Sequence, residues 1–329
     1  MSAITIEAPA KINAHLQVGD RRLDGFHDLE SLFLALAFGD TLHFETTPSE
    51  AGLEIAMNGP AALPLAIPPA ENIISRAVSL FRDRTGFDQG LKVTVEKRIP
   101  FGGGLGGGSS DAAAALLALN CLAADGGSFL NAAELAEMGA FLGSDVPFFL
   151  YNSPAAWVTG RGEQIQPLEL PGLAPKYALV LVNPGFSSDT AEAYRLLDDI
   201  RLSQNITTEF HGGKNLGFST ILNHLKTPCT PWLNNLGTNS TPQDWPFFND
   251  FLPVLLNSDK GAVYQRIMGE LRELGAGFAG LSGSGSTCFG VFSREDQAES
   301  ARKTLSERWP FVIISFLLVR RTIPCYNRK

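Results

Sequence analysis

Hydrophobic and polar positions alternate along residues 4–19, ITIEAPAKINAHLQVG. Ile12, Ala14 and Leu16 take one face of such a segment, because successive side chains of a strand point to opposite sides. Lys11 and Asn13 take the other face. The pattern therefore predicts a half-buried strand on which Lys11 and Asn13 are neighbours. Two later segments alternate in the same way: residues 41–47 (TLHFETT) and 91–97 (LKVTVEK).

Other segments repeat their apolar residues at the spacing of a helix. Residues 71–86 end in glycine, and residues 109–123 begin with two serines, which suit the end and the start of a helix. Further helices are predicted over residues 131–143, 190–200, 263–275 and 296–308. Buried strands are predicted over residues 177–185, 283–293 and 311–321.

Strands and helices are mixed without strict alternation, so the predicted fold class is α+β rather than a doubly wound sheet. A polar, proline-containing stretch at residues 163–175 divides the chain into two patterns, giving predicted domains 1–167 and 168–329. Residues 203–250 stand apart, being rich in Asn, Thr, Gly and Pro. We expect an insertion around 203–250, as a subdomain, a lid or a decorated loop, and it carries aromatic residues: Trp232, Trp245, Phe247 and Phe248.

The composition narrows the classes of function. Of 329 residues 44% are hydrophobic and 18% charged, and the net charge is −8. This balance is typical of a globular protein and argues against a nucleic-acid or membrane-surface partner, which would need clustered positive charge. The first residues lack a signal-peptide pattern, and four widely spaced cysteines include no C-x-x-C pair. We therefore expect a cytoplasmic protein with reduced thiols and no zinc site.

One short stretch carries the chemistry: residues 100–115, PFGGGLGGGSSDAAAA, with six glycines in seven positions. A Walker loop is excluded, because no lysine follows the glycines. Gly102, Gly104 and Gly107 match the dinucleotide pattern G-x-G-x-x-G, but the required strand–helix–strand context is missing. The remaining reading is a strand–loop–helix cradle, in which glycine amides and the start of the next helix bind a polyphosphate.

Three motifs in this order resemble those of the GHMP kinases, which phosphorylate small alcohols. The glycine stretch looks like their central ATP-binding motif, and APAKINAHLQV with DGFHDLESLF (residues 8–18 and 24–33) and GLSGSGSTCFG (280–290) look like the flanking motifs. With GSDVPFFL at 143–150, the pattern is most similar to the kinases of 4-diphosphocytidyl-2-C-methyl-D-erythritol. The resemblance implies a ribosomal protein S5 domain 2-like N-terminal domain and a ferredoxin-like C-terminal domain. It spans most of the chain except residues 203–250, a segment longer than the family usually has.

The resemblance also implies roles for two residues, Asp145 as the general base and Lys11 as a catalytic lysine. An aspartate beside a proline in GSDVP is otherwise a good turn or helix cap. A lysine close to Asp145 would favour the ionised carboxylate and stabilise charge on the substrate oxygen. Asn13, on the same strand face, is a weaker candidate for holding substrate.

At the substrate end, the resembling enzymes contact cytosine with an aromatic residue and a histidine in the motif that here reads GFH. Phe26 and His27 occupy those positions, although the family often has tyrosine where Phe26 stands. Tyr194 is expected either to stack on the other face of the base or to be a core residue. Thr190, four residues before it, is also predicted to bind substrate.

The nucleotide site is expected to use Asn72, unless that residue only caps its helix, together with the glycine stretch. Either Ser109 or Ser110 caps the second helix and is expected to contact phosphate or its magnesium ion. Ser282–Ser286 would let a turn press against the glycines; the family often has Ala-Cys where Ser286 and Thr287 stand. The predicted nucleotide-binding residues are Pro100, Gly102, Gly103, Gly104, Leu105, Gly106, Gly107, Gly108, Ser109, Ser110 and Asn72.

The expected function is ATP- and Mg²⁺-dependent phosphorylation of the 2-hydroxyl of 4-diphosphocytidyl-2-C-methyl-D-erythritol, in the non-mevalonate isoprenoid pathway. Alternatives are another small-molecule kinase of the superfamily, acting on mevalonate, homoserine or a sugar, and a nucleotide-binding protein without catalysis. A more distant alternative is an NAD-binding oxidoreductase. ATP and a small substrate are the expected partners, a homodimer is possible, and no side-chain metal cluster is expected.

Overall fold

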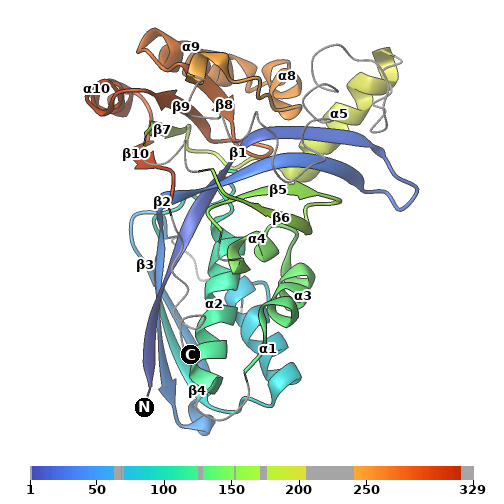
Figure 1. Ribbon diagram of the computed structural model, residues 1–329, viewed down its shortest axis with the longest axis vertical. Coiled ribbons are helices and arrows are strands. Elements are labelled where there is room, and N and C mark those ends of the chain that lie inside the picture. Colours follow the sequence, from blue (N-terminus) through green and yellow to red (C-terminus); the bar gives the residue numbers. More distant parts are fainter. Residues whose placement is uncertain are drawn as a thin grey trace.

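The computed structural model describes residues 2–62, 68, 70–124, 129–151, 153–170, 176–204 and 241–319. Most of the predicted insertion, residues 205–240, thus lies outside the described residues. Two sheets, each covered by helices, form the molecule, and Figure 1 shows them one above the other. This is the predicted α+β class.

The larger sheet has the strand order β3-β4-β2-β5-β6, with β1 paired to β2. Only β3 and β4 are parallel. Four helices and a 3-10 turn belong to the same half of the chain. The bounds are β1 Ala3–Arg21, β2 His27–Thr47, η1 Ser49–Ala51, β3 Leu53–Asn58, α1 Ile73–Thr85, β4 Gly90–Glu96, α2 Gly107–Ala124, α3 Ala132–Leu142, α4 Val146–Leu150, β5 Ala155–Thr159 and β6 Gln164–Leu168.

The smaller sheet is fully antiparallel, with the order β10-β7-β9-β8. Numbered along the chain, this is the order 4-1-3-2 of a ferredoxin-like β-α-β-β-α-β unit, which confirms the prediction for the C-terminal half. Its strands are β7 Ala178–Asn183, β8 Phe278–Leu281, β9 Cys288–Phe292 and β10 Phe311–Phe316, and its helical segments are α5 Thr190–Gln204, η2 Pro242–Asp244, α8 Phe251–Leu256, α9 Gly261–Glu273 and α10 Glu295–Ser306.

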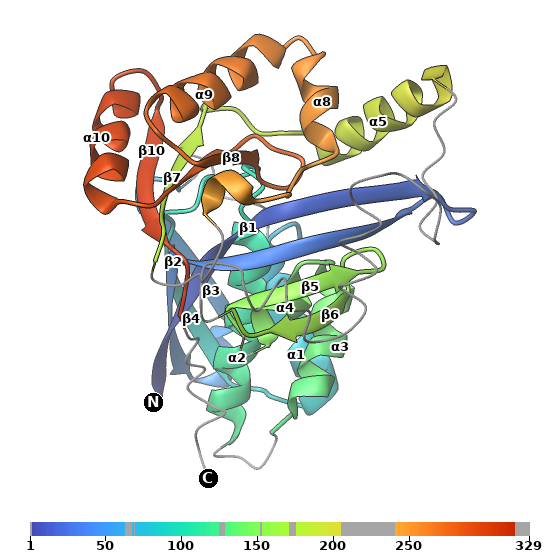
Figure 2. The ribbon, with the colours of Figure 1, turned by 45° about the horizontal axis from the view of Figure 1, so that its top comes forward.

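The long hairpin of β1 and β2 lies between the two halves, with α5 and α8 on one side and β5 and β6 on the other (Figure 2). For this reason β1 is not half-buried as predicted: Lys11, Asn13 and His15 on its polar face are all at least 97% buried. Burial lowers the pKa of His15 to about 3, so its imidazole is neutral. Bulges after Pro9 and after Asn13 also interrupt the strict alternation. The polar face of β1 is thus an internal surface.

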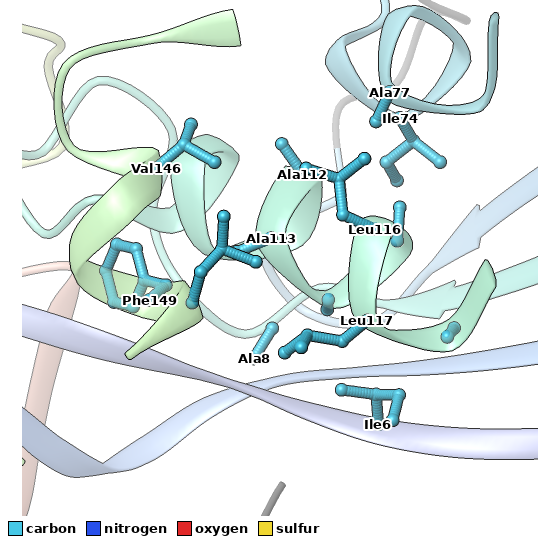
Figure 3. Close-up of a cluster of buried hydrophobic side chains, with 14 of the residues drawn as sticks. Ile6, Ala8, Ile74, Ala77, Ala112, Ala113, Leu116, Leu117, Val146 and Phe149 are labelled. Atoms are coloured by element: carbon cyan, nitrogen blue, oxygen red, sulfur yellow. The ribbon is translucent and has the colours of Figure 1, made fainter. Parts of the chain in front are cut away.

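Helix α2 is the centre of the N-terminal core. Its run of alanines allows close packing on all sides, and residues 110–121 are buried. Figure 3 shows these contacts, which hold the start of α2, and hence the end of the glycine stretch, in a fixed place. The labelled side chains come from β1 (Ile6, Ala8), α1 (Ile74, Ala77), α2 (Ala112, Ala113, Leu116, Leu117) and α4 (Val146, Phe149).

The end of the expected insertion, residues 241–250, packs into the body of the protein rather than forming a lid. Trp245 packs edge-on against Tyr177, and both lie in the hydrophobic cluster between the two sheets. The backbone N–H of Leu16 donates to the carbonyl of Phe248, and the N–H of Val18 donates to Asp250 Oδ2. This segment therefore fastens the C-terminal half to the β1 hairpin.

The structure also bears on the predictions about the cysteines and about membrane-spanning helices. Cys288 is a free thiol, and its burial raises its pKa to about 12. Cys121, in contrast, is disulfide-bonded. The prediction that all cysteines are reduced was therefore wrong. Spacing along the sequence does not show which cysteines meet in space. No helix in the described part of the chain has both the length and the apolar character needed to cross a membrane. The domain boundary at 167/168 stays a prediction.

Candidate active site

Two cavities meet at the glycine stretch. The larger, of about 880 Å³, lies along β1, the start of β2, the segment before α4 and α5. The smaller, of about 380 Å³, lies between the start of α1, the end of β4 and the glycines, and Pro100, Gly102–Gly108 and Asn72 all line it. Gly104, Gly106 and Ser109 line both cavities. A group bound in one cavity can therefore reach a group bound in the other.

Asp145 and Lys11 form an ion pair in the wall of the larger cavity. Asp145 Oδ2 lies 3.2 Å from Lys11 Nζ. Asp145 directly precedes α4, yet its side chain makes no capping hydrogen bond. The structure thus places together the two residues expected to be catalytic, and the carboxylate is not used as a cap. The side chain of Asp145 is 28% exposed and that of Lys11 only 4%, so the acid is the more accessible partner.

Lys11 is held in one direction by its surroundings. Its ammonium donates to Asn13 Oδ1 at 2.5 Å and lies 4.3 Å from the centre of the Phe33 ring. Asn13 Nδ2 donates to Ser31 Oγ at 2.8 Å. Both ends of the Asn13 amide are therefore engaged by the protein. Asn13 lines the cavity as predicted, but its contacts position Lys11; a role in holding substrate stays a prediction.

The glycine stretch is locked against the C-terminal motif. Ser282 Oγ donates to the carbonyl of Gly104 at 2.8 Å, and the N–H of Thr287 donates to the carbonyl of Gly103 at 3.1 Å. Gly104 has φ +76°, and a Cβ there would lie 2.2 Å from the Ser282 carbonyl oxygen. The turn does press on the glycines as expected, so one half of the protein braces the loop of the other.

The start of α2 differs from the prediction. The helix begins at Gly107, two residues before the serines, so Ser109 and Ser110 lie in its first turn and neither is the cap. Ser109 lines both cavities, whereas Ser110 is buried and lines neither. The amides of Gly107 and Gly108 are among the unpaired N–H groups of a helix start. Asn72 caps α1, accepting from the N–H of Ile74, and also lines the smaller cavity.

A buried charge cluster borders the smaller cavity. Lys97 Nζ lies 2.5 Å from Asp40 Oδ2 and 2.6 Å from Asp111 Oδ2. Asp40 also accepts from the backbone N–H groups of Arg98 and Ile99, whereas Asp111 Oδ1 has no partner in the described part of the chain. Burial, opposed by Lys97 and reinforced by Asp40, raises the pKa of Asp111 to about 7. The cluster ties the end of β4 to the first turn of α2.

The far end of the larger cavity is formed by aromatic and imidazole rings. Tyr194 stacks on His27, with ring centres 4.9 Å apart, rather than facing Phe26. His27 Nε2 lies 2.9 Å from Asp198 Oδ1, which leaves Nδ1 for another partner. Burial, followed by the charge of Asp145, raises the pKa of Tyr194 to about 12, so its phenol is neutral. Thr190 lines the same cavity and hydrogen-bonds to Ser284.

Comparison with known proteins gives the family that the sequence motifs resemble, the GHMP kinases. The family models for the GHMP kinases N-terminal and C-terminal domains match residues 72–153 and 260–310. A 4-diphosphocytidyl-2-C-methyl-D-erythritol kinase of Treponema pallidum (strain Nichols) is 37% identical over 94% of this chain and 97% of its own length. The chain belongs to this family of GHMP kinases.

Solved structures agree with this family assignment. A crystal structure of 4-(cytidine 5'-diphospho)-2C-methyl-D-erythritol kinase is 30% identical, covers 95% of this chain and 99% of its own, and superposes with a TM-score of 0.69. A homoserine kinase from Cytophaga hutchinsonii superposes with a TM-score of 0.67 over 98% of this chain and 97% of its own, but at 16% identity. The second likeness shows only the shared two-domain GHMP kinase fold, which the sequence predicts.

GHMP kinases use ATP. The glycine-lined cavity of this family member includes the start of α2, where the first backbone N–H groups have no partner within the helix. Among the residues that the structure describes, no group of three or more His, Cys, Asp or Glu side chains could hold a metal ion. Among the residues that line both cavities, Ser109 is the one that carries a side-chain hydroxyl.

Sequence reasoning missed several residues of the site. Asp198, which pairs with His27, lies on the polar face of a predicted helix, and its acidic character gave no sign of a partner 171 positions away. Phe33 and Ser31, which orient Lys11 and Asn13, lie on the neighbouring strand. Both belong to the motif at residues 24–33, but the motif gave them no role, because only strand pairing shows that they face Lys11 and Asn13.

Proposed function

We propose that this kinase transfers the γ-phosphoryl group of ATP to the 2-hydroxyl of 4-diphosphocytidyl-2-C-methyl-D-erythritol. One observation carries the proposal: an ion pair of Asp145 and Lys11 stands where two cavities meet at a glycine loop. ATP would occupy the smaller cavity and the alcohol the larger. The similarity to relatives that bear this activity in their names, at 37% identity, supports the choice of substrate.

In this reaction the substrate hydroxyl oxygen forms a bond to the γ-phosphorus, and the bond from phosphorus to the β-bridging oxygen breaks, releasing ADP. The hydroxyl proton passes to the carboxylate of Asp145, which is exposed to the cavity. Lys11 cannot turn away, because Asn13 and Phe33 hold its ammonium. It therefore stabilises negative charge on the attacking oxygen.

The glycine stretch and the first turn of α2 would position the triphosphate. These residues line the smaller cavity, and the backbone N–H groups of a helix start need no reorganisation when charge develops. Gly108 is open on its Cβ side, with no atom within 4 Å, so a phosphate oxygen can approach the backbone. A bound Mg²⁺ would neutralise the charge of the transferring phosphates. Ser109 is the hydroxyl that we assign to it.

Phe26, His27 and Tyr194 would receive the cytidine end of the substrate. Asp198 holds Nε2 of His27, so Nδ1 is the nitrogen left to meet the edge of the base. Since Tyr194 already stacks on His27, we assign it to orienting the imidazole rather than to the second face of the cytosine. Thr190, at the start of α5, is placed beside the substrate. We further place the reaction in the cytoplasm, where ATP is available.

The test is to mix the purified protein with ATP, Mg²⁺ and the cytidine substrate and to follow the products by phosphorus NMR. A new phosphomonoester signal that grows with ADP is expected. Mevalonate, homoserine and simple sugars, supplied in parallel, should give no product. Turnover of one of these instead would assign another GHMP kinase activity, and ATP binding without any turnover would support the non-catalytic alternative.

A further inference from the structure

Arg161 covers one face of the Phe26 ring. It lies in the turn between β5 and β6, and its guanidinium carbon is 4.9 Å from the centre of that ring. Phe26 is 54% exposed and lies in the turn between β1 and β2. Both residues line the larger cavity. Two turns from different parts of the sheet thus meet at the end of the cavity that we assign to cytidine.

The charge of Arg161 is not matched by an ion pair with any described residue. Arg195 in the same cavity is ion-paired with Glu192 and Asp199. Within the described ranges, no carboxylate lies within 4 Å of the Arg161 guanidinium. Glu163 accepts from the Arg161 backbone N–H at 2.7 Å, and Asp24, which is ion-paired with Arg22, interacts with the charge of Arg161 only from beyond ion-pair distance. A cationic side chain that lines a cavity and forms no ion pair is available to an anionic ligand.

The contact with Phe26 uses none of the hydrogen-bond donors of Arg161. The guanidinium lies over the ring, and the N–H groups that do not face the ring form the fork that matches phosphate oxygens. We propose that Arg161 binds the diphosphate that joins cytidine to the erythritol of the substrate. Its contact with Phe26 then fixes both the fork and the ring, and the free face of Phe26 remains for the base. This inference rests on the proposed function, because it takes the substrate to be a cytidine diphosphate ester.

Steady-state kinetics of R161Q and R161K test the proposal. R161Q should raise the KM for the cytidine substrate by about 10-fold or more, the usual effect of losing a charged hydrogen bond, while kcat and the KM for ATP stay within about two-fold. R161K keeps the charge without the fork and should fall between. K260Q is a matched control, because Lys260 lies 4.2 Å above the Phe186 ring but lines neither cavity. It should leave all constants unchanged.

Binding of CDP and of cytidine, measured by calorimetry, separates this inference from the proposed function. R161Q should lose affinity for CDP but not for cytidine. Equal loss for both ligands would show that Arg161 only holds Phe26, and no loss for either would show that it is not a ligand contact; each result overturns the proposal. If the unchanged protein binds CDP through Arg161 but does not phosphorylate the substrate, the proposed function alone fails. Melting temperatures verify that each variant is folded.

Discussion

Asp145 Oδ2 lies 3.2 Å from Lys11 Nζ, although the two residues come from different elements, the start of α4 and the middle of β1. An aspartate directly before a helix normally accepts from the first backbone N–H groups of that helix. Asp145 makes no such bond. Its carboxylate instead faces an ammonium in a substrate-sized cavity, which is the arrangement that a general base for an alcohol requires.

The first prediction concerns D145N. The amide cannot accept the hydroxyl proton, so kcat should fall by at least about 100-fold while the KM for ATP changes little. The carboxylate caps nothing, but it is the ion-pair partner of the buried Lys11, so the melting temperature should fall while the protein remains folded. Rapid-quench or coupled-enzyme kinetics and a thermal melt measure both. Turnover near the original value would remove Asp145 as the base.

Asp189 offers the opposite pattern and serves as a control. Its side chain accepts from the N–H groups of Ala191 and Glu192 at the start of α5, and it lines neither cavity. D189A should therefore lower stability by about 1 kcal/mol, the usual cost of a lost cap, and retain turnover. The two aspartates together distinguish loss of chemistry from loss of fold.

The second prediction is that arginine does not replace Lys11. A Cβ on Gly106 would lie 3.1 Å from Lys11 Cγ, and the ammonium is confined over Phe33 and beside Asn13. The larger guanidinium does not fit this space, and its charge is spread over a fork. K11R and K11A should both lower kcat by about 100-fold, the scale of losing one electrostatic contact to the transition state. A K11R enzyme with kcat near the original would show that only the charge matters.

The sequence predicts most of the elements, because their periods are strong and their ends are marked. Helix α1 ends at Gly86 in the left-handed conformation, as its terminal glycine indicates. The sequence predicts the start of α2 less well. The helix begins at Gly107, but glycines at residues 107 and 108 are not typical of a helix, so the sequence indicates a later start.

Contacts between distant segments are what the sequence does not contain. Lys11 is buried by Phe33, Asp145 and the glycine stretch, and His15 is buried in part by Phe247 and Phe248 of the C-terminal half. Periodicity cannot show such a covering surface. The partners of His27 and Phe26 are likewise set by how α5 and the β5–β6 turn approach the hairpin. Motifs name the residues of this site, and tertiary structure decides which of them touch.

The third prediction compares two glycines of the same loop. Gly104 has φ +76° and no room for a Cβ, which would meet backbone oxygens of Ser282 and Gly285 at 2.2 and 2.7 Å. G104A should lower stability by at least about 1–3 kcal/mol, the cost of a strained backbone conformation, and separate the loop from its brace. G108A should leave stability unchanged or raise it, because no atom lies within 4 Å and alanine favours a helix. It should instead raise the KM for ATP. Urea unfolding and kinetics measure the pair, and equal loss of stability in both would contradict the bracing role of Gly104.

The fourth prediction concerns the cluster of Lys97, Asp40 and Asp111. An unfolded aspartate loses its proton near pH 3.8, whereas folding raises the pKa of Asp111 to about 7. Between these values the folded state binds the extra proton, so this group makes stability fall as the pH rises from about 4 to 7, by no more than about 4 kcal/mol. D111N should remove that dependence and leave Lys97 balanced by Asp40. Melting temperatures of D111N and the unchanged protein should thus be similar at pH 5, and toward pH 8 the melting temperature of D111N should become the higher of the two.

D40N should lose stability at every pH, because Asp40 accepts from two backbone N–H groups as well as from Lys97. A D111N protein that is less stable at pH 8 than at pH 5, relative to the unchanged protein, would mean that the ionised Asp111 stabilises the fold.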